Sequence, residues 1–94
     1  NHLAANHHEQ IFYLPDGSLL ETTIGNLILE IKGKLYTPPA HLPILDGIYR
    51  HHLLETGQVE EKLLTLKDLE LADQVYACNA LRGLYPLDFT RKDS

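Results

Sequence analysis

The feature that most constrains the fold is a series of short β-forming segments, each closed by a turn signal within a few residues. Segments 10–14 and 18–23 flank the triplet "PDG", whose glycine supplies the positive φ of a tight turn. Segments 27–32 and 35–37 flank "KGK", and two prolines then end the series because proline cannot donate to a strand ladder. We therefore predict four short strands, with a break between the first and second pair at Gly25-Asn26.

The spacing of the apolar residues changes to a helical period further along the chain. Asp46 is a good N-cap, and Gly57 suits the position just after a helix. Between them, Tyr49, Leu53 and Leu54 form one apolar stripe. This segment therefore predicts a single amphipathic helix.

The last third of the chain combines one more helix with further strands. Thr65 and Asp68 have the spacing of a capping box, which predicts a short helix that runs through Ala72. Residues 74–79 then indicate a buried strand, and residues 81–89 a loop followed by a strand. Because strands and helices interleave, the predicted class is mixed α and β, either α+β or α/β.

Length and composition indicate one folded unit. The chain has 94 residues, of which 44% are hydrophobic and 22% charged, a composition typical of a globular domain and not of disorder. We treat residues 1–94 as a single unit in which residues 1–9 are a helix end or a frayed tail and residues 90–94 a polar tail. The chain opens with Asn1 and contains no methionine, so we expect a fragment or a processed product.

Charge and cysteine content argue against several classes of function. The formal net charge is −5 and no Lys/Arg cluster is present, so nucleic-acid binding is not expected. The apolar runs are too short to span a membrane, and residues 1–10 lack the apolar stretch of a signal peptide. The single cysteine, Cys78, cannot form an internal disulfide, and a cytoplasmic location is therefore predicted. His51 and His52 are neighbours on a helix, which favours a solvated pair over a metal site.

One acidic residue is unusual in its surroundings. Glu21 stands between an apolar pair and the stretch "TTIGN", where strand alternation would carry it past buried groups. From the pattern alone, a solvated strand glutamate is the preferred interpretation, because glutamate is rarely buried without a partner. Asn26 is equally well explained as a turn residue.

Three blocks of sequence, taken in order, resemble a known family. They are "LLETTIGNLILEIKGKLYTPP", "ILDGIYRHHLLE" and "LTLKDLELADQVYACNALRGLYPL". Together they are similar to the C-terminal half of class IV enzymes that depend on pyridoxal 5′-phosphate (PLP), a family of branched-chain and D-amino-acid aminotransferases and of 4-amino-4-deoxychorismate lyases. The resemblance covers about Glu9 to Pro86 and implies an incomplete C-terminal PLP-binding domain of the D-amino-acid aminotransferase-like fold.

The resemblance implies a role for Glu21 and Asn26, which begin and end the "E-x-x-x-x-N" pattern of the first block. In the family, this acid pairs with the pyridine nitrogen of PLP. A carboxylate beside that nitrogen favours the protonated ring, which is the better electron sink. The resemblance therefore makes Glu21 a candidate cofactor-binding residue and reverses the preference for a solvated glutamate.

The second block implies a phosphate-binding turn over Leu45–Arg50. The start of a helix offers free N–H groups and a partial positive charge, and Gly47 would let the backbone come close. The resemblance assigns Leu45, Gly47 and the backbone amides of Ile48 and Tyr49 to this turn. The alternative is an ordinary capped helix start, and Arg50 is better explained as a structural ion-pair residue.

The third block implies that Asn79 and Ala80 hold the other side of the phosphate. Class IV aminotransferases tend to have Gly-Thr or Ser-Thr at this turn, and often a threonine where Tyr49 stands. Here both hydroxyls are missing, which leaves backbone amides and the Asn79 side chain, and the "NAL" wording resembles the lyase branch. We interpret Cys78 as a small buried hydrophobic residue.

The family's covalent PLP anchor, a lysine upstream of the acid, has no counterpart here, because the first lysine is Lys32. We therefore expect no catalytic residue in this chain, which is predicted to be a C-terminal fragment of a 4-amino-4-deoxychorismate lyase that forms 4-aminobenzoate and pyruvate in folate biosynthesis. The resemblance further implies a dimer, or fusion or association with a para-aminobenzoate synthase component. The alternatives are an aminotransferase fragment or a non-catalytic binding or assembly domain.

Overall fold

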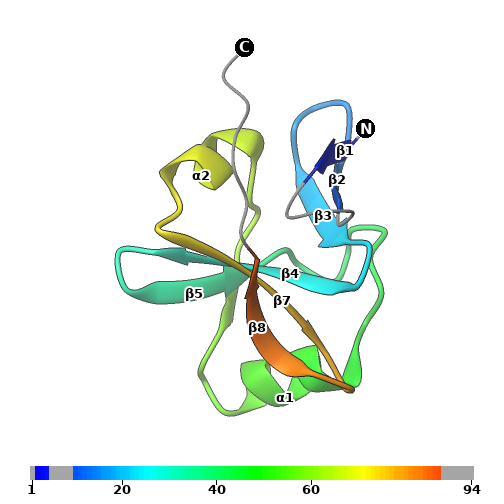
Figure 1. The fold of residues 1–94 in the computed structure, drawn as a ribbon, viewed down its shortest axis with the longest axis vertical. Coiled ribbons are helices and arrows are strands. Elements are labelled where there is room, and N and C mark those ends of the chain that lie inside the picture. The colour runs from blue at the N-terminus through cyan, green and yellow to red at the C-terminus, as the bar shows by residue number, and fades with distance from the viewer. Residues whose placement is uncertain (1, 5–9, 88–94) are drawn as a thin grey trace.

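The computed structural model of the chain describes residues 2–4 and 10–87, which form one branched, mostly antiparallel sheet with two helices against it (Figure 1). In chain order, the elements are β1 His2–Ala4, β2 Gln10–Tyr13, β3 Leu19–Thr22, β4 Gly25–Ile31, β5 Lys34–Thr37, α1 Ile48–Glu55, β6 Glu60–Glu61, α2 Leu66–Leu71, β7 Gln74–Asn79 and β8 Gly83–Leu87.

The sheet branches at β4, its longest strand. Asn26 pairs with Glu21 of β3 on one edge of β4 and with Cys78 of β7 on the other. Leu29, further along, pairs with Tyr36 of β5 and again with β7. Because β7 occupies one whole edge, β3 and β5 share the opposite edge in succession. All these pairings are antiparallel, and among the described strands only β5 and β6 run parallel.

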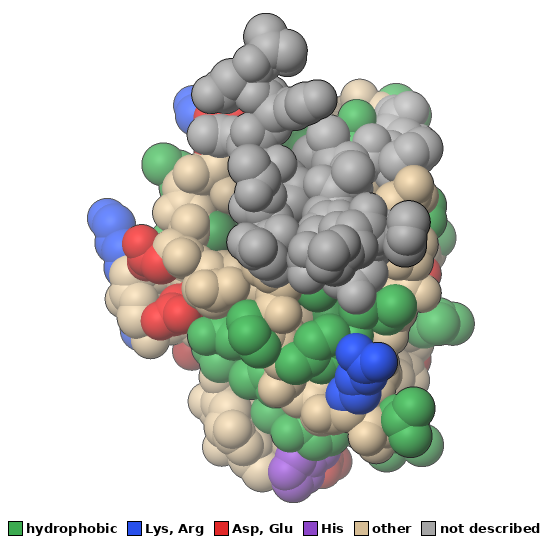
Figure 2. All heavy atoms as spheres, viewed as in Figure 1, with side chains coloured by type: hydrophobic (Ala, Val, Ile, Leu, Met, Phe, Trp, Pro, Cys, Tyr) green, Lys and Arg blue, Asp and Glu red, His purple; other side chains and the backbone are tan. Residues whose placement is uncertain are grey.

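Apolar side chains are buried on both faces of β4, which explains its continuous apolar run. Leu27 and Leu29 belong to the larger core cluster, beneath α2 and the β2–β3 hairpin. Ile28 points the other way and packs with Leu53 of α1 and with Cys78. Figure 1 shows the two helices at opposite ends of the sheet. Hydrophobic side chains also gather over β7 and β8 on the face seen in Figure 2.

Most predicted elements are confirmed, including the "PDG" turn, in which Gly17 has φ 92°. The predicted break at Gly25-Asn26 is wrong, because these residues begin β4 and the turn lies at residues 23–24. Glycine is needed at position 25 for another reason: a Cβ there would collide with the Cys78 carbonyl oxygen on β7. The glycine at position 25 therefore reflects close packing of two strands and not a turn.

Both helix predictions hold, with one correction at the start of α1. Its N-cap is Gly47 and not Asp46. The Asp46 carboxylate instead contacts Arg50 Nη1 at 3.3 Å and His51 Nε2 at 3.2 Å. Gly57 follows the helix with φ 79°, as predicted. The predicted capping box of α2 is present in both directions.

The prediction of a helix end or frayed tail over residues 1–9 is corrected in part. His2–Ala4 form β1, which pairs with β2. Residues 1, 5–9 and 88–94, including the predicted polar tail at 90–94, lie outside the described residues. Within the described part of the chain, no helix has the length and apolar character to cross a membrane.

Candidate functional site

A pocket of about 570 Å³ lies where the β3–β4 hairpin, the segment before α1 and the β7–β8 turn meet. Its volume falls within the range of small-molecule sites. Seven of the eight predicted site residues contribute to its wall, and Tyr49 does not. The lining residues are Phe12, Glu21, Thr22, Thr23, Ile24, Gly25, Asn26, Leu45, Gly47, Ile48, Cys78, Asn79 and Ala80.

Glu21 is a half-buried residue of β3 and contributes a carboxylate to the pocket wall. Its Oε1 accepts a hydrogen bond from the Leu45 amide at 2.9 Å. Its second oxygen, Oε2, has no hydrogen-bond partner among the described residues. One oxygen therefore anchors the chain before α1, while the other can accept a hydrogen bond from a bound molecule.

Asn26 faces the same segment from β4, directly opposite Glu21 in the strand register. Its Nδ2 donates to the Leu45 carbonyl at 2.8 Å, and only 5% of the residue is exposed. A Cβ on Gly47 would come within 2.5 Å of Asn26 Oδ1, so the close approach requires glycine at position 47. The interpretation of Asn26 as a turn residue is therefore wrong, since it is a strand residue that holds the entry to α1.

The start of α1 presents backbone donors. Gly47 is the N-cap, and no side chain caps the helix. The first backbone hydrogen bond of the helix runs from the His51 amide to the Gly47 carbonyl. The amides of Ile48 and Tyr49 therefore have no capping acceptor among the described residues. With the partial positive charge of a helix N-terminus, such amides suit an anion.

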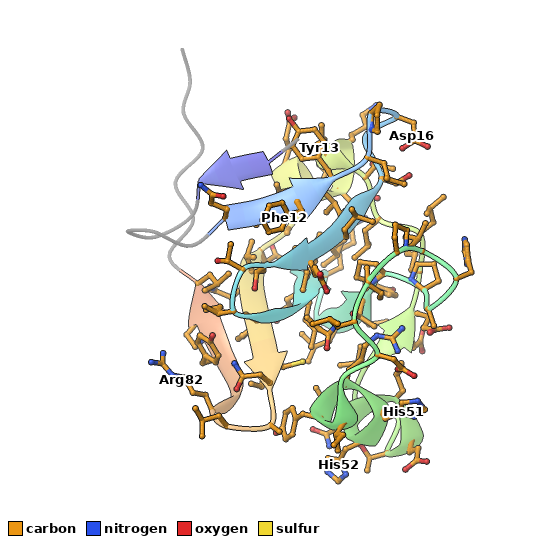
Figure 3. All side chains as sticks on the ribbon, turned by 90° about the vertical axis from the view of Figure 1, so that its right-hand side faces the viewer. Phe12, Tyr13, Asp16, His51, His52 and Arg82 are labelled. Carbon is orange, nitrogen blue, oxygen red and sulfur yellow. The ribbon has the colours of Figure 1, made fainter. Side chains whose placement is uncertain are left out.

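The side chains at the start of α1 serve other purposes. Arg50 is 2% exposed and is an ion-pair residue, as predicted: its Nη2 contacts Glu61 Oε2 at 2.6 Å and donates to the Pro38 carbonyl at 2.9 Å. Tyr49 packs toward the β7–β8 turn, with its hydroxyl oxygen 3.4 Å from the place of a Cβ on Gly83. In Figure 3, His52 points away from the body of the molecule.

The β7–β8 turn forms the opposite wall. Asn79 Nδ2 donates to the Ile24 carbonyl at 2.6 Å, and its Oδ1 accepts from the amides of Leu81 and Arg82. The Ala80 amide has no acceptor among the described residues. The wall therefore presents one free backbone donor, while most of the hydrogen-bonding capacity of the Asn79 side chain is already used.

Cys78 is fully buried behind this wall, as predicted. Burial raises the pKa of its thiol to about 11, and the nearby positive charge of Arg50 only partly opposes this effect. The thiol is therefore protonated at neutral pH and is a poor nucleophile.

Among the residues that line the pocket, Glu21 carries the charged side chain, and the described lining includes no lysine, arginine or histidine. Lys32 lies away from it, exposed in the β4–β5 turn with φ 54°. The described residues also contain no cluster of side chains that could hold a metal ion. A bound anion would therefore meet backbone amides on these walls.

Two parts of the wall were not predicted from the sequence. Phe12 enters the pocket from β2 and lies beside β3 in Figure 3. Thr22 shapes the β3–β4 turn, because its Oγ1 donates to the Gly25 carbonyl at 2.8 Å and accepts from the amides of Ile24 and Gly25. The "TTIG" wording was a signal for such a threonine turn.

One pocket of the branched sheet is thus surrounded by a carboxylate and by two turns that present backbone amides. The family model for amino-transferase class IV matches residues 1–88. The chain belongs to the class IV aminotransferase family, and the resemblance drawn from the three sequence blocks is confirmed.

Both branches of the family are found among its relatives. An aminodeoxychorismate lyase of Vibrio harveyi is 36% identical over 74 residues, which cover 73% of this chain and 27% of the relative. A probable branched-chain-amino-acid aminotransferase of Thermotoga maritima is 30% identical over 77 residues, which cover 77% and 28%. The chain thus spans little more than a quarter of the length of these two relatives.

Solved structures agree on the fold. A putative 4-amino-4-deoxychorismate lyase of Legionella pneumophila has a TM-score of 0.75 and 30% identity, over 93% of this chain and 36% of that one. An aminotransferase of Brucella abortus, solved with PLP bound, has a TM-score of 0.73 and 26% identity, over 84% and 30%. The expected class, a mixed α and β part of the class IV fold, is confirmed.

Proposed function

We propose that this chain is the part of a PLP-dependent enzyme that holds the cofactor, and that the pocket binds PLP. The observation that carries the proposal is the convergence of three groups on one pocket: the Glu21 carboxylate, the uncapped start of α1 and the free Ala80 amide. They come from segments far apart in the sequence.

The donor set fits a phosphate group. The amides of Ile48 and Tyr49 lie at a helix start that no side chain caps, and Ala80 offers a donor from the facing turn. Charge-assisted hydrogen bonds from backbone N–H groups to an anion are stronger than those between neutral groups. Gly47 allows the backbone of the helix start to pack closely against Asn26.

The acid fits the other end of the cofactor. Glu21 Oε2 is free to accept a hydrogen bond from a protonated pyridine nitrogen, while Oε1 stays bound to the Leu45 amide. A carboxylate at this position keeps the proton on the ring nitrogen. PLP, when bound, supplies the electron sink for the reaction. The residues of this chain orient the cofactor by its phosphate and hold that proton.

We infer that the full-length enzyme is a 4-amino-4-deoxychorismate lyase, which releases pyruvate and forms 4-aminobenzoate in folate biosynthesis. Support comes from Asn79-Ala80 and Tyr49, which stand where aminotransferases of the family tend to carry hydroxyls, and from the lyase relative at 36% identity. Aromatisation of the ring favours this elimination. We further propose a cytoplasmic enzyme that supplies its lysine from upstream and is dimeric or joined to a para-aminobenzoate synthase component.

The second candidate is an aminotransferase of the same family, which the relative at 30% identity favours. Both candidates use the cofactor groups in the same way, so a substrate assay separates them. The full-length enzyme should release pyruvate from 4-amino-4-deoxychorismate and transfer little amino group from valine to 2-oxoglutarate. Faster transamination of valine than formation of 4-aminobenzoate would refute the lyase assignment.

A further inference from the structure

We propose that Asn79 is a positioning residue: it sets the β7–β8 turn so that the turn can bind a phosphate group, and it does not itself bind that group. This inference rests on the proposed function, because it concerns how the same pocket holds the phosphate end of its ligand. It differs from the sequence-based expectation that Asn79 contacts the cofactor.

The hydrogen bonds of Asn79 are mostly spent within the protein. Its Oδ1 accepts from the Leu81 amide at 3.0 Å and from the Arg82 amide at 2.8 Å. A carbonyl oxygen has two lone pairs, so this acceptor is fully used. Its Nδ2 donates to the Ile24 carbonyl at 2.6 Å, which leaves one N–H of the side chain. The side chain therefore acts mainly on the protein backbone.

These bonds decide which amide of the turn is left for a ligand. Because Oδ1 engages the amides of Leu81 and Arg82, the amide of Ala80 is the donor in this turn that keeps no acceptor among the described residues. Ala80 lines the pocket, and its methyl side chain offers no donor of its own. Without the hydrogen bonds of Asn79, the backbone of the turn would not be held in the conformation that orients the Ala80 amide.

Asn79 also fixes the turn relative to the rest of the pocket. Its bond to Ile24 joins β7 to the β3–β4 turn, 55 residues earlier in the chain. On its other side the β7–β8 turn meets α1, where the Tyr49 hydroxyl packs against Gly83. A change at Asn79 should therefore alter the distance between the Ala80 amide and the amides at the start of α1. This distance affects only a ligand that carries a phosphate.

The test compares two ligands in the full-length protein that contains this chain. Pyridoxine 5′-phosphate and pyridoxine differ only in the phosphate, and neither has an aldehyde that could react with lysine. Calorimetry should show that the wild type prefers the phosphorylated ligand. In Asn79→Ala this preference should fall at least tenfold, the scale of one charge-assisted hydrogen bond, while the affinity for pyridoxine stays within about twofold.

Gln74→Ala is the matched control. Gln74 is a half-buried amide of the same strand and also donates to backbone carbonyls, those of Val75 and Leu87, but it lies outside the pocket. Its variant should keep the wild-type preference. If Asn79→Ala does not fold, Asn79→Ser replaces it, because a serine hydroxyl can accept from the turn amides but is too short to reach Ile24. For Asn79→Ser, the preference for the phosphorylated ligand should lie between that of the wild type and that of a site with equal affinity for both ligands.

The outcomes separate the two proposals. A wild type without preference for the phosphorylated ligand would refute the phosphate site itself, and the role of Asn79 with it. An unchanged preference in the Asn79 variant, or an equal loss for both ligands, would overturn only the positioning role. In ¹⁵N NMR of the wild type, phosphate should shift the Ala80 amide more than the Asn79 side-chain amide, and the reverse order would make Asn79 a direct ligand.

Discussion

Replacing Glu21 by glutamine in the full-length enzyme should remove the charge at the proposed ring-nitrogen site and leave the architecture in place. Glutamine has nearly the same shape, and its Oε1 can still accept from the Leu45 amide, a bond of 2.9 Å in the wild type. The cost in stability is the difference between a charged and a neutral acceptor, about 1 kcal/mol. The backbone amides that we propose as the phosphate site are untouched, so PLP should still bind.

The effect on turnover should be much larger. Without the carboxylate, the pKa of the ring nitrogen should fall by roughly two to three units, and each unit is about 1.36 kcal/mol. A loss of about 3–4 kcal/mol in stabilisation of the reacting carbanion lowers the rate by on the order of a hundredfold or more. Pyruvate release and PLP content are to be measured on the same preparation. Normal turnover in a PLP-loaded variant would refute the role of Glu21.

Glu30→Gln provides the matched control for this prediction. Glu30 is also a half-buried strand glutamate, and its Oε1 accepts from the Tyr76 hydroxyl at 3.4 Å. It lies on β4 outside the pocket lining. Its variant should keep normal turnover, with a stability change within about 0.5 kcal/mol. An equal loss of turnover in both variants would point to a general effect of removing negative charge.

Three further predictions follow from the same contacts. Gly25→Ala should destabilise the protein by about 2–3 kcal/mol in urea unfolding, because the new methyl group meets the Cys78 carbonyl; an unchanged midpoint would contradict this close packing. Cys78 should resist alkylation at pH 8 in the native protein and react in denaturant, because burial raises its pKa to about 11 and closes access; rapid labelling of the native state would contradict this. Borohydride treatment of the 94-residue chain with PLP should label no single lysine stoichiometrically, since the described lining of the pocket includes no lysine, and one fully labelled peptide would refute this.

Local signals in the sequence were sufficient for most of the elements. The capping box at Thr65 and Asp68 and the glycine after α1 act within a few residues, so their pattern alone specifies the structure. The start of α1 shows the limit of such signals. Asp46 has the residue type of an N-cap, but its carboxylate contacts Arg50 and His51, and this competition cannot be judged without the structure.

The long-range contacts that join the walls of the pocket could not be predicted from local patterns. A turn residue and a site residue were equally good interpretations of Asn26, because its bond to the Leu45 carbonyl spans 19 residues and leaves no local signal. Gly25 was assigned to a break because the reason for a glycine lies on β7, a strand that comes some fifty residues later in the chain. The family resemblance indicates both Glu21 and Asn26 as site residues, but it does not show that both side chains bond to the backbone of Leu45.

The walls of the pocket are tied to one another, and this explains why three separate blocks of sequence are needed for one site. Glu21 and Asn26 both hold the backbone of Leu45: Glu21 accepts from its amide, and Asn26 donates to its carbonyl. Asn79 holds the Ile24 carbonyl and so joins the β7–β8 turn to the β3–β4 turn. A ligand that enters therefore does not have to order these segments, so less conformational entropy is lost on binding. Glu21, Asn26 and Asn79 thus all fix the backbone, and Glu21 alone of the three also keeps a carboxylate oxygen without a partner among the described residues. A substitution at Asn26 or Asn79 should therefore act on the geometry of the pocket before it acts on chemistry.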